Sequence, residues 1–112
     1  MPLYAVIGFD HPPHSMPLRD EFRAAHRSFA LENDQGTRLT GAMFDAQGNQ
    51  CGTLTICEAD SAEQVQELYR REPFYRNNVY KEFHVIEWHL ALNRFEPTGG
   101  WLPNYPTRIC RT

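Results

Sequence analysis

The period of the apolar residues alternates along the chain between the two-residue repeat of a strand and the longer repeat of a helix. This order constrains the fold more than any other feature. Residues 18–36 place Leu18, Phe22, Ala25 and Phe29 on one helical face. The predicted segments are strand 2–9, helix 18–36, strands 37–45 and 51–59, helix 60–72 and strand 80–92.

This β-α-β-β-α-β order is typical of the α+β class, and in particular of the ferredoxin-like arrangement, in which one antiparallel sheet carries both helices on one face. The final strand has apolar residues at even positions (Tyr80, Ile86 and Trp88) and at odd positions (Phe83 and Val85). We therefore expect both faces of the sheet to be covered. In a chain of 112 residues the simplest second cover is another copy, so the sequence predicts a homodimer with its two sheets face to face.

The length is sufficient for one small domain, which we expect to span residues 1–92. Residues 93–112 contain several Pro and Gly residues and show no period. They nevertheless include Trp101 and Tyr105, and such apolar content is unusual for a solvated tail. We predict that this C-terminal extension is ordered and packs on the body of the domain or on the dimer partner.

The net charge of −3 and the absence of a run of Lys or Arg argue against nucleic acid or a membrane surface as a partner. The first residues do not resemble a signal peptide, and no segment is long and apolar enough to cross a bilayer, so we expect a cytoplasmic protein. The three cysteines lack zinc or redox spacing. His11 and His14 could form a metal pair, but no third ligand is evident, so we expect no metal.

Two ionisable residues lie on the apolar faces of the predicted helices. When residues are placed 100° apart, His26 falls beside Phe22 and Phe29, and Glu72 falls beside Val65 at the end of the second helix. Each residue alone has an ordinary explanation, since a histidine can bond to a backbone carbonyl and a carboxylate can bend to solvent. If they meet, however, they stabilise each other's charged forms and make an acid/base pair.

The motifs that surround these residues resemble those of the YciI-like (YCII-related) family. The matching features are a first strand ending in Asp10, the Arg-x-x-His pattern of Arg23 and His26, and the Glu72-Pro73-Phe74 sequence, where the family usually has Asp-Pro-Tyr/Phe. The resemblance covers roughly residues 3–90 and implies a dimeric α/β barrel of ferredoxin-like subunits. It also implies an active site that pairs the helix histidine with the acidic residue before the proline.

The resemblance implies a small cofactor-independent enzyme in which His26 is the general acid/base and Glu72 orients it. Arg23, Asp10 and Phe74 are the candidate substrate-binding residues. The family's relatives suggest lyase or isomerase chemistry on a small cyclic or aromatic compound, including dehydrochlorinase-like elimination of halide from a hydroxylated ring. A non-catalytic small-molecule-binding or accessory domain is the alternative, and a cofactor-free oxygenase is a third hypothesis. Fold alone does not distinguish them.

Overall fold

The structure, a computed structural model, describes residues 1–96 and 99–100. Trp101 and Tyr105, which the sequence predicts to be ordered, lie outside the described residues. Within the described part, the elements follow one another as β1 (Leu3–Asp10), α1 (Met16–Asn33), β2 (Thr37–Phe44), β3 (Gln50–Glu58), α2 (Ala62–Arg70), α3 (Pro73–Arg76) and β4 (Tyr80–Trp88).

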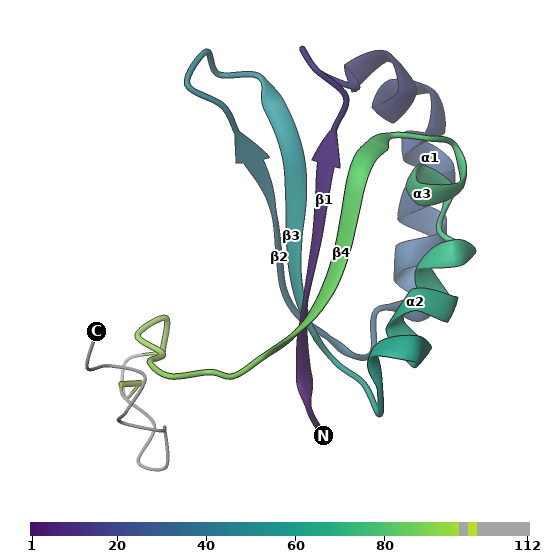
Figure 1. The fold of residues 1–112 in the computed structure, drawn as a ribbon. Helices are drawn as coiled ribbons and strands as arrows, with labels where there is room; N and C mark the ends of the chain where they lie inside the picture. The colour runs from purple at the N-terminus through teal and green to yellow at the C-terminus, as the bar shows by residue number, and fades with distance from the viewer. Residues whose placement is uncertain (97–98, 101–112) are drawn as a thin grey trace.

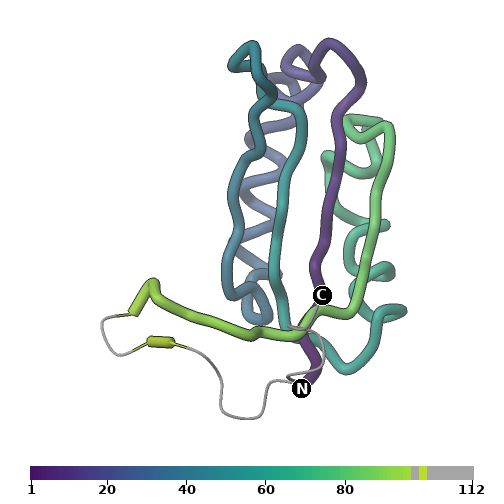
Figure 2. The backbone as a smooth tube through the Cα atoms, turned by 60° about the vertical axis from the view of Figure 1, so that its left-hand side comes forward, coloured from purple at the N-terminus to yellow at the C-terminus, as the bar shows by residue number. Residues whose placement is uncertain are grey.

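The strands form one four-stranded sheet in the order β2-β3-β1-β4, and every neighbouring pair is antiparallel. The helices α1, α2 and α3 lie on one face of this sheet, and none of the described helices covers the opposite face, which is called the open face below (Figure 1). Figure 2 shows the same arrangement from another side, with the segment that follows β4 leading away on the open side. The predicted α+β, ferredoxin-like fold is therefore confirmed.

The register of the strands gives the two faces different compositions, because residues paired across antiparallel strands point to the same side. One row on the open face is apolar across all four strands: Leu39, Ile56, Ala5 and Ile86. The adjacent row on the helix side consists of Thr40, Thr55, Val6 and Val85. In this row the helix side is thus aliphatic on β1 and β4, and it carries hydroxyls on β2 and β3.

The second helix begins with a cap formed by the side chains of Ser61 and Gln64. The Ser61 hydroxyl accepts a hydrogen bond from Gln64 N at 3.1 Å, and the Gln64 side chain accepts one from Asp60 N at 2.7 Å. Val65, on the inner face, is 3% exposed and belongs to the hydrophobic core. The helix ends at Arg70, two residues earlier than predicted, because the residue before a proline disfavours helical geometry.

The first helix differs from its prediction in bounds and in burial. It begins at Met16 and ends at Asn33, before Gly36. Ala25, expected on the buried stripe, is exposed, and Arg19 is the buried residue of this helix among those described. No described helix has the length and apolar character needed to cross a membrane.

The final strand also differs from its prediction. It ends at Trp88, and a register shift opposite Phe9 and Asp10 changes the direction of its first side chain. Tyr80 pairs with Asp10, so it lies on the helix side with Phe83 and not on the face of Ile86, as strict alternation had placed it. Its ring lies over Gly8, where an added Cβ would come within 2.6 Å of it. This irregularity brings a tyrosine hydroxyl to the inside of the domain.

Candidate active site

A cleft of about 800 Å³ lies between the helices and the β2–β3 half of the sheet. Its helix side includes His26 and Phe29 from α1 and Leu68 and Tyr69 from α2. Its floor is formed by the side chains of the sheet that carry hydroxyls, namely Thr40, Thr53, Thr55 and Tyr80. Because α2 packs against β4 while α1 packs against α3, the space above β2 and β3 remains open to a ligand.

His26 and Glu72 meet at one end of this cleft. The Nδ1–H of His26 donates a hydrogen bond to Glu72 Oε1. The second carboxylate oxygen, Oε2, accepts a hydrogen bond from Tyr75 N at 3.0 Å, so Glu72 is the N-cap of the short helix α3. The Glu72 side chain is 5% exposed, whereas that of His26 is 36% exposed. The carboxylate is therefore fixed inside the protein, and the imidazole borders the cleft.

Phe74 fixes the plane of the imidazole. The two rings stack with their centroids 4.0 Å apart and their planes 7° from parallel. Phe74 is itself 3% exposed, and the guanidinium carbon of Arg19 lies 5.2 Å from its centroid. Phe74, a candidate substrate-binding residue in the sequence, is thus packed behind His26 in the structure and is not part of the cleft wall.

The floor of the cleft is a network of hydroxyl groups. The Thr40 and Thr55 hydroxyls are 2.8 Å apart, and the Thr53 hydroxyl donates to Tyr80 Oη at 3.0 Å. Burial raises the pKa of Tyr69 to about 12 and also raises the pKa of Tyr80. Both phenols are therefore protonated at neutral pH and able to donate hydrogen bonds. Such a floor suits a ligand that carries oxygen atoms.

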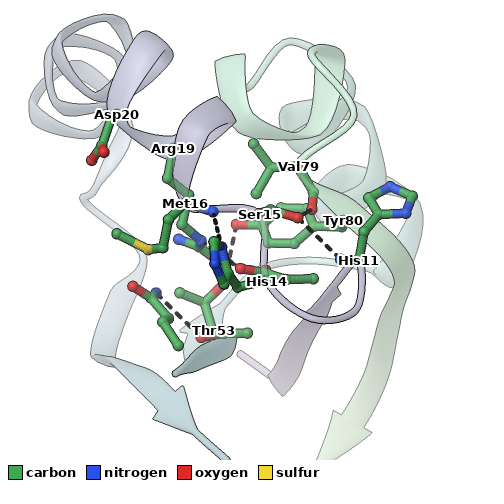
Figure 3. A network of polar contacts seen from close by, with 12 residues as sticks. His11, His14, Ser15, Met16, Arg19, Asp20, Thr53, Val79 and Tyr80 are labelled. Carbon is green, nitrogen blue, oxygen red and sulfur yellow. Dashed lines mark hydrogen bonds and ion pairs between the residues drawn. The ribbon is translucent and has the colours of Figure 1, made fainter. Parts of the chain in front are cut away.

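Asp10 is occupied by a partner that sequence reasoning missed. Arg19 donates from Nε and Nη2 to the two carboxylate oxygens, each at 2.7 Å, and both side chains are buried. Burial lowers the pKa of Arg19, and the ion pair with Asp10 more than offsets this effect, so the net shift is upward. Figure 3 shows Arg19 near Thr53 and Tyr80 within the polar network at this end of the sheet. Asp10 does not border the cleft.

The other polar residues considered from sequence lie away from the cleft. Arg23 forms an exposed ion pair with Asp20 at 2.8 Å. His14 accepts a hydrogen bond from Met16 N at 3.2 Å, and the neighbouring His11 donates its backbone N–H to Ser15 (Figure 3). Within residues 1–96 and 99–100, no group of three or more His, Cys, Asp or Glu residues is arranged to hold a metal ion.

A family model covers most of the chain. The YCII-related domain matches residues 3–89. The chain belongs to the YCII-related family. Membership confirms the resemblance that the motifs around Arg23, His26 and Glu72 had suggested. The match ends one residue beyond β4 and includes both members of the His26–Glu72 pair.

One solved structure similar to this YCII-related protein is 5-chloro-2-hydroxyhydroquinone dehydrochlorinase (TftG) from Burkholderia phenoliruptrix AC1100, in complex with 2,5-dihydroxybenzoquinone. The TM-score is 0.69 at 22% sequence identity, and the alignment covers 78% of this chain and 93% of the other. At this identity the likeness shows a shared fold. Comparison with the curated proteins gives no significant match.

Proposed function

We propose that this YCII-related protein is a small cofactor-independent enzyme that performs general acid/base chemistry on a small cyclic or aromatic compound. The observation that carries the proposal is the pairing of His26, at the edge of the cleft, with the buried carboxylate of Glu72. That bond occupies Nδ1. The opposite nitrogen, Nε2, makes no hydrogen bond to residues 1–96 or 99–100, so it is available to a ligand in the cleft.

The reaction begins with transfer of a proton from a substrate hydroxyl or an activated carbon to Nε2 of His26. Glu72 stabilises the resulting imidazolium through Nδ1–H, and the Phe74 stack keeps the ring in place. In a lyase the electron pair left on the substrate expels a leaving group, and His26 then releases its proton to that group or to solvent. In an isomerase His26 returns the proton to a different substrate atom. In both cases the site gains and loses one proton per turnover, and His26 ends the cycle as it began.

Three further features support this proposal. The cleft has a volume within the usual range of small-molecule sites. Its floor presents the hydroxyls of Thr53 and Tyr80, which suit an oxygenated ring. The similarly folded TftG is named as a dehydrochlorinase, and its solved complex contains 2,5-dihydroxybenzoquinone, a small oxygenated ring. These features favour lyase or isomerase chemistry of the same general kind.

A non-catalytic small-molecule-binding domain is the second candidate, and the burial of Glu72 favours it. This carboxylate joins α1 to α3 by accepting hydrogen bonds from His26 and from Tyr75 N, which would also be a good structural tie. In that case the cleft would bind its ligand without a proton transfer. The two candidates differ in whether removal of the Glu72 charge affects turnover or only stability.

We also propose that the protein acts as a homodimer in which two open sheet faces pack against each other. Leu39, Leu54 and Ile86 lie on this face and are 51%, 40% and 53% exposed in the single chain. Exposed apolar side chains of this size on three strands of one sheet face favour a protein partner. A two-fold symmetric dimer is the commonest assembly in which a second copy of the same chain covers such a face.

The proposed enzymatic function is tested by a thermal-shift screen of ring-hydroxylated and lactone compounds. Each compound that stabilises the protein is then incubated with wild-type protein and with His26→Gln, and its conversion is followed by mass spectrometry. We expect a compound that wild-type protein converts and that His26→Gln binds without converting. Stabilising compounds that neither protein converts would support the binding domain instead.

A further inference from the structure

We propose that the compound bound in the cleft carries an anionic group, such as a carboxylate, and that Arg71 binds this group. The inference rests on the proposed function, because it places the substrate ring beside His26. The inference extends the proposed function by giving the charge of the substrate and the residue that recognises this charge. Arg71 is exposed at the C-terminal cap of α2, and its side chain contributes to the cleft wall.

Arg71 differs from the other arginine of the cleft, Arg38, in having no carboxylate partner within residues 1–96 and 99–100. Four other arginines form ion pairs with carboxylates at 2.6–3.0 Å: Arg19, Arg23, Arg38 and Arg70. Of these, only Arg38 also borders the cleft. The Arg38 guanidinium is occupied by Glu58 at 3.0 Å and by the carbonyl of Gln35 at 3.1 Å. Arg71 is therefore the cleft arginine with donors left for a ligand.

The position of Arg71 relative to His26 is set by Phe29. The Arg71 guanidinium carbon lies 5.8 Å from the centroid of the Phe29 ring. Phe29 is three residues after His26 on α1, so the two side chains lie on adjacent turns of one helix face, separated by ~4.5 Å along the axis. His26 and Arg71 both border the cleft. One substituted ring can therefore contact His26 with one edge and present a carboxylate to Arg71 with another.

The acidic residues of the cleft do not cancel this positive charge. Glu58 pairs with Arg38, and Glu67 pairs with Arg70 at 2.6 Å. The carboxylate of Glu72 is buried, and its two oxygens accept hydrogen bonds from His26 and from Tyr75 N. Asp34 follows α1 eight residues after His26, which corresponds to ~12 Å along a helix. Of the two arginines that border the cleft, Arg71 is therefore the one without an opposite charge beside it among the described residues. A guanidinium presents a planar set of N–H donors that matches the two oxygens of a carboxylate.

The test uses two probes that differ in charge but hardly in shape, 2,5-dihydroxybenzoate and 2,5-dihydroxybenzamide. Their affinities are measured by calorimetry, and binding is located by the NMR signals of the His26 imidazole. We expect wild-type protein to bind the carboxylate about three- to tenfold more tightly than the amide, as suits one partly exposed charged contact. Raising the salt concentration should reduce this preference.

The variant Arg71→Gln should bind both probes equally, and Arg71→Lys should keep part of the preference. Arg76→Gln is the matched control, because Arg76 is also exposed, has no carboxylate partner among the described residues and does not border the cleft. It should behave as wild type.

Three outcomes would contradict the inference. Equal loss of preference in Arg76→Gln and Arg71→Gln would mean that general positive charge is responsible. If wild-type protein binds both probes equally next to His26, the anionic-substrate inference fails while the proposed function stands. If neither probe perturbs His26 in any variant, the cleft is not a site for such rings, and both the inference and the proposed function fail.

Discussion

Glu72 accepts a hydrogen bond from His26, a residue that precedes it by 46 positions in the chain. The same carboxylate accepts a hydrogen bond from Tyr75 N and so begins the short helix α3. The extended backbone of Glu72, with φ −73° and ψ 129°, is the geometry that a following proline favours. The Glu72-Pro73 sequence thus ends α2, caps α3 and directs a carboxylate toward α1. This arrangement is the basis of the first prediction.

Replacement of Glu72 by Gln should separate the two functional candidates. Gln keeps the shape of the side chain but removes the charge that stabilises the imidazolium. If His26 is a general acid/base, turnover of a substrate should fall by roughly 10²–10⁴-fold while the circular dichroism spectrum is unchanged. Glu32→Gln, an exposed change on α1, is the control and should retain full turnover. A fall in melting temperature with no change in turnover would instead identify Glu72 as a structural tie.

Loss of one member of the buried Asp10–Arg19 pair should destabilise the protein more than replacement of both members by apolar residues. Asp10→Asn leaves the Arg19 guanidinium buried without its counter-charge and should lower the free energy of unfolding by about 3 kcal/mol. The double variant Asp10→Leu/Arg19→Met replaces both charges by apolar groups and should recover most of this loss. Urea unfolding at neutral pH measures both values. A double variant as unstable as Asp10→Asn would contradict the prediction.

Tyr69 should make the protein less stable at high pH. Burial raises its folded-state pKa to about 12, whereas the ordinary value is 10.0. Between pH 10 and 12 the folded protein keeps a proton that the unfolded chain loses, so stability is fully present below pH 10 and falls as the pH rises. The loss should reach about 2–3 kcal/mol for this one group.

The variant Tyr69→Phe tests this effect because it cannot ionise. As the pH rises from 9 to 12, the free energy of unfolding of Tyr69→Phe should increase by about 2 kcal/mol relative to that of wild type, so the variant becomes the more stable of the two by comparison. Urea unfolding across this range gives both curves. Tyr80 remains in both proteins, so its own raised pKa affects them equally. Parallel curves over the whole range would show that the phenol of Tyr69 ionises as freely in the folded state as in the unfolded state.

Sequence periodicity predicted much of this fold because the long segments have clear repeats. The same angular reasoning placed His26 and Glu72 on inner faces, and the structure brings them into contact. It could not reveal α3, since a helix of four residues is too short to show a period. The Glu72-Pro73 sequence carried a usable signal for α3, because a carboxylate before proline is a good helix start.

Other features of the site depend on contacts that periodicity cannot show. Arg19 looks like an exposed charge in a polar stretch, and its partner Asp10 lies across a loop that precedes α1. Tyr80 changes faces because one residue of β4 is irregularly paired. The hydroxyl floor of the cleft follows from the strand order, which sets Thr40 beside Thr55. Prediction of each of these features requires the pairing of strands and the contacts between distant segments, in addition to the local sequence pattern.

The open sheet face should be the site of self-association, and Ile86→Lys tests this. Ile86 lies in the apolar row that crosses all four strands and is 53% exposed in the single chain. In a two-fold interface each change occurs twice, so two charges would be buried and the dimer dissociation constant should rise by roughly 100-fold or more. Light scattering at micromolar concentration should show dimers for wild type and monomers for Ile86→Lys. Leu31→Lys is the matched control, because Leu31 is 78% exposed on α1, on the helix side of the sheet. Leu31→Lys should remain dimeric. The sheet face would be excluded as the interface if both variants dissociated alike or if the wild-type protein were a monomer.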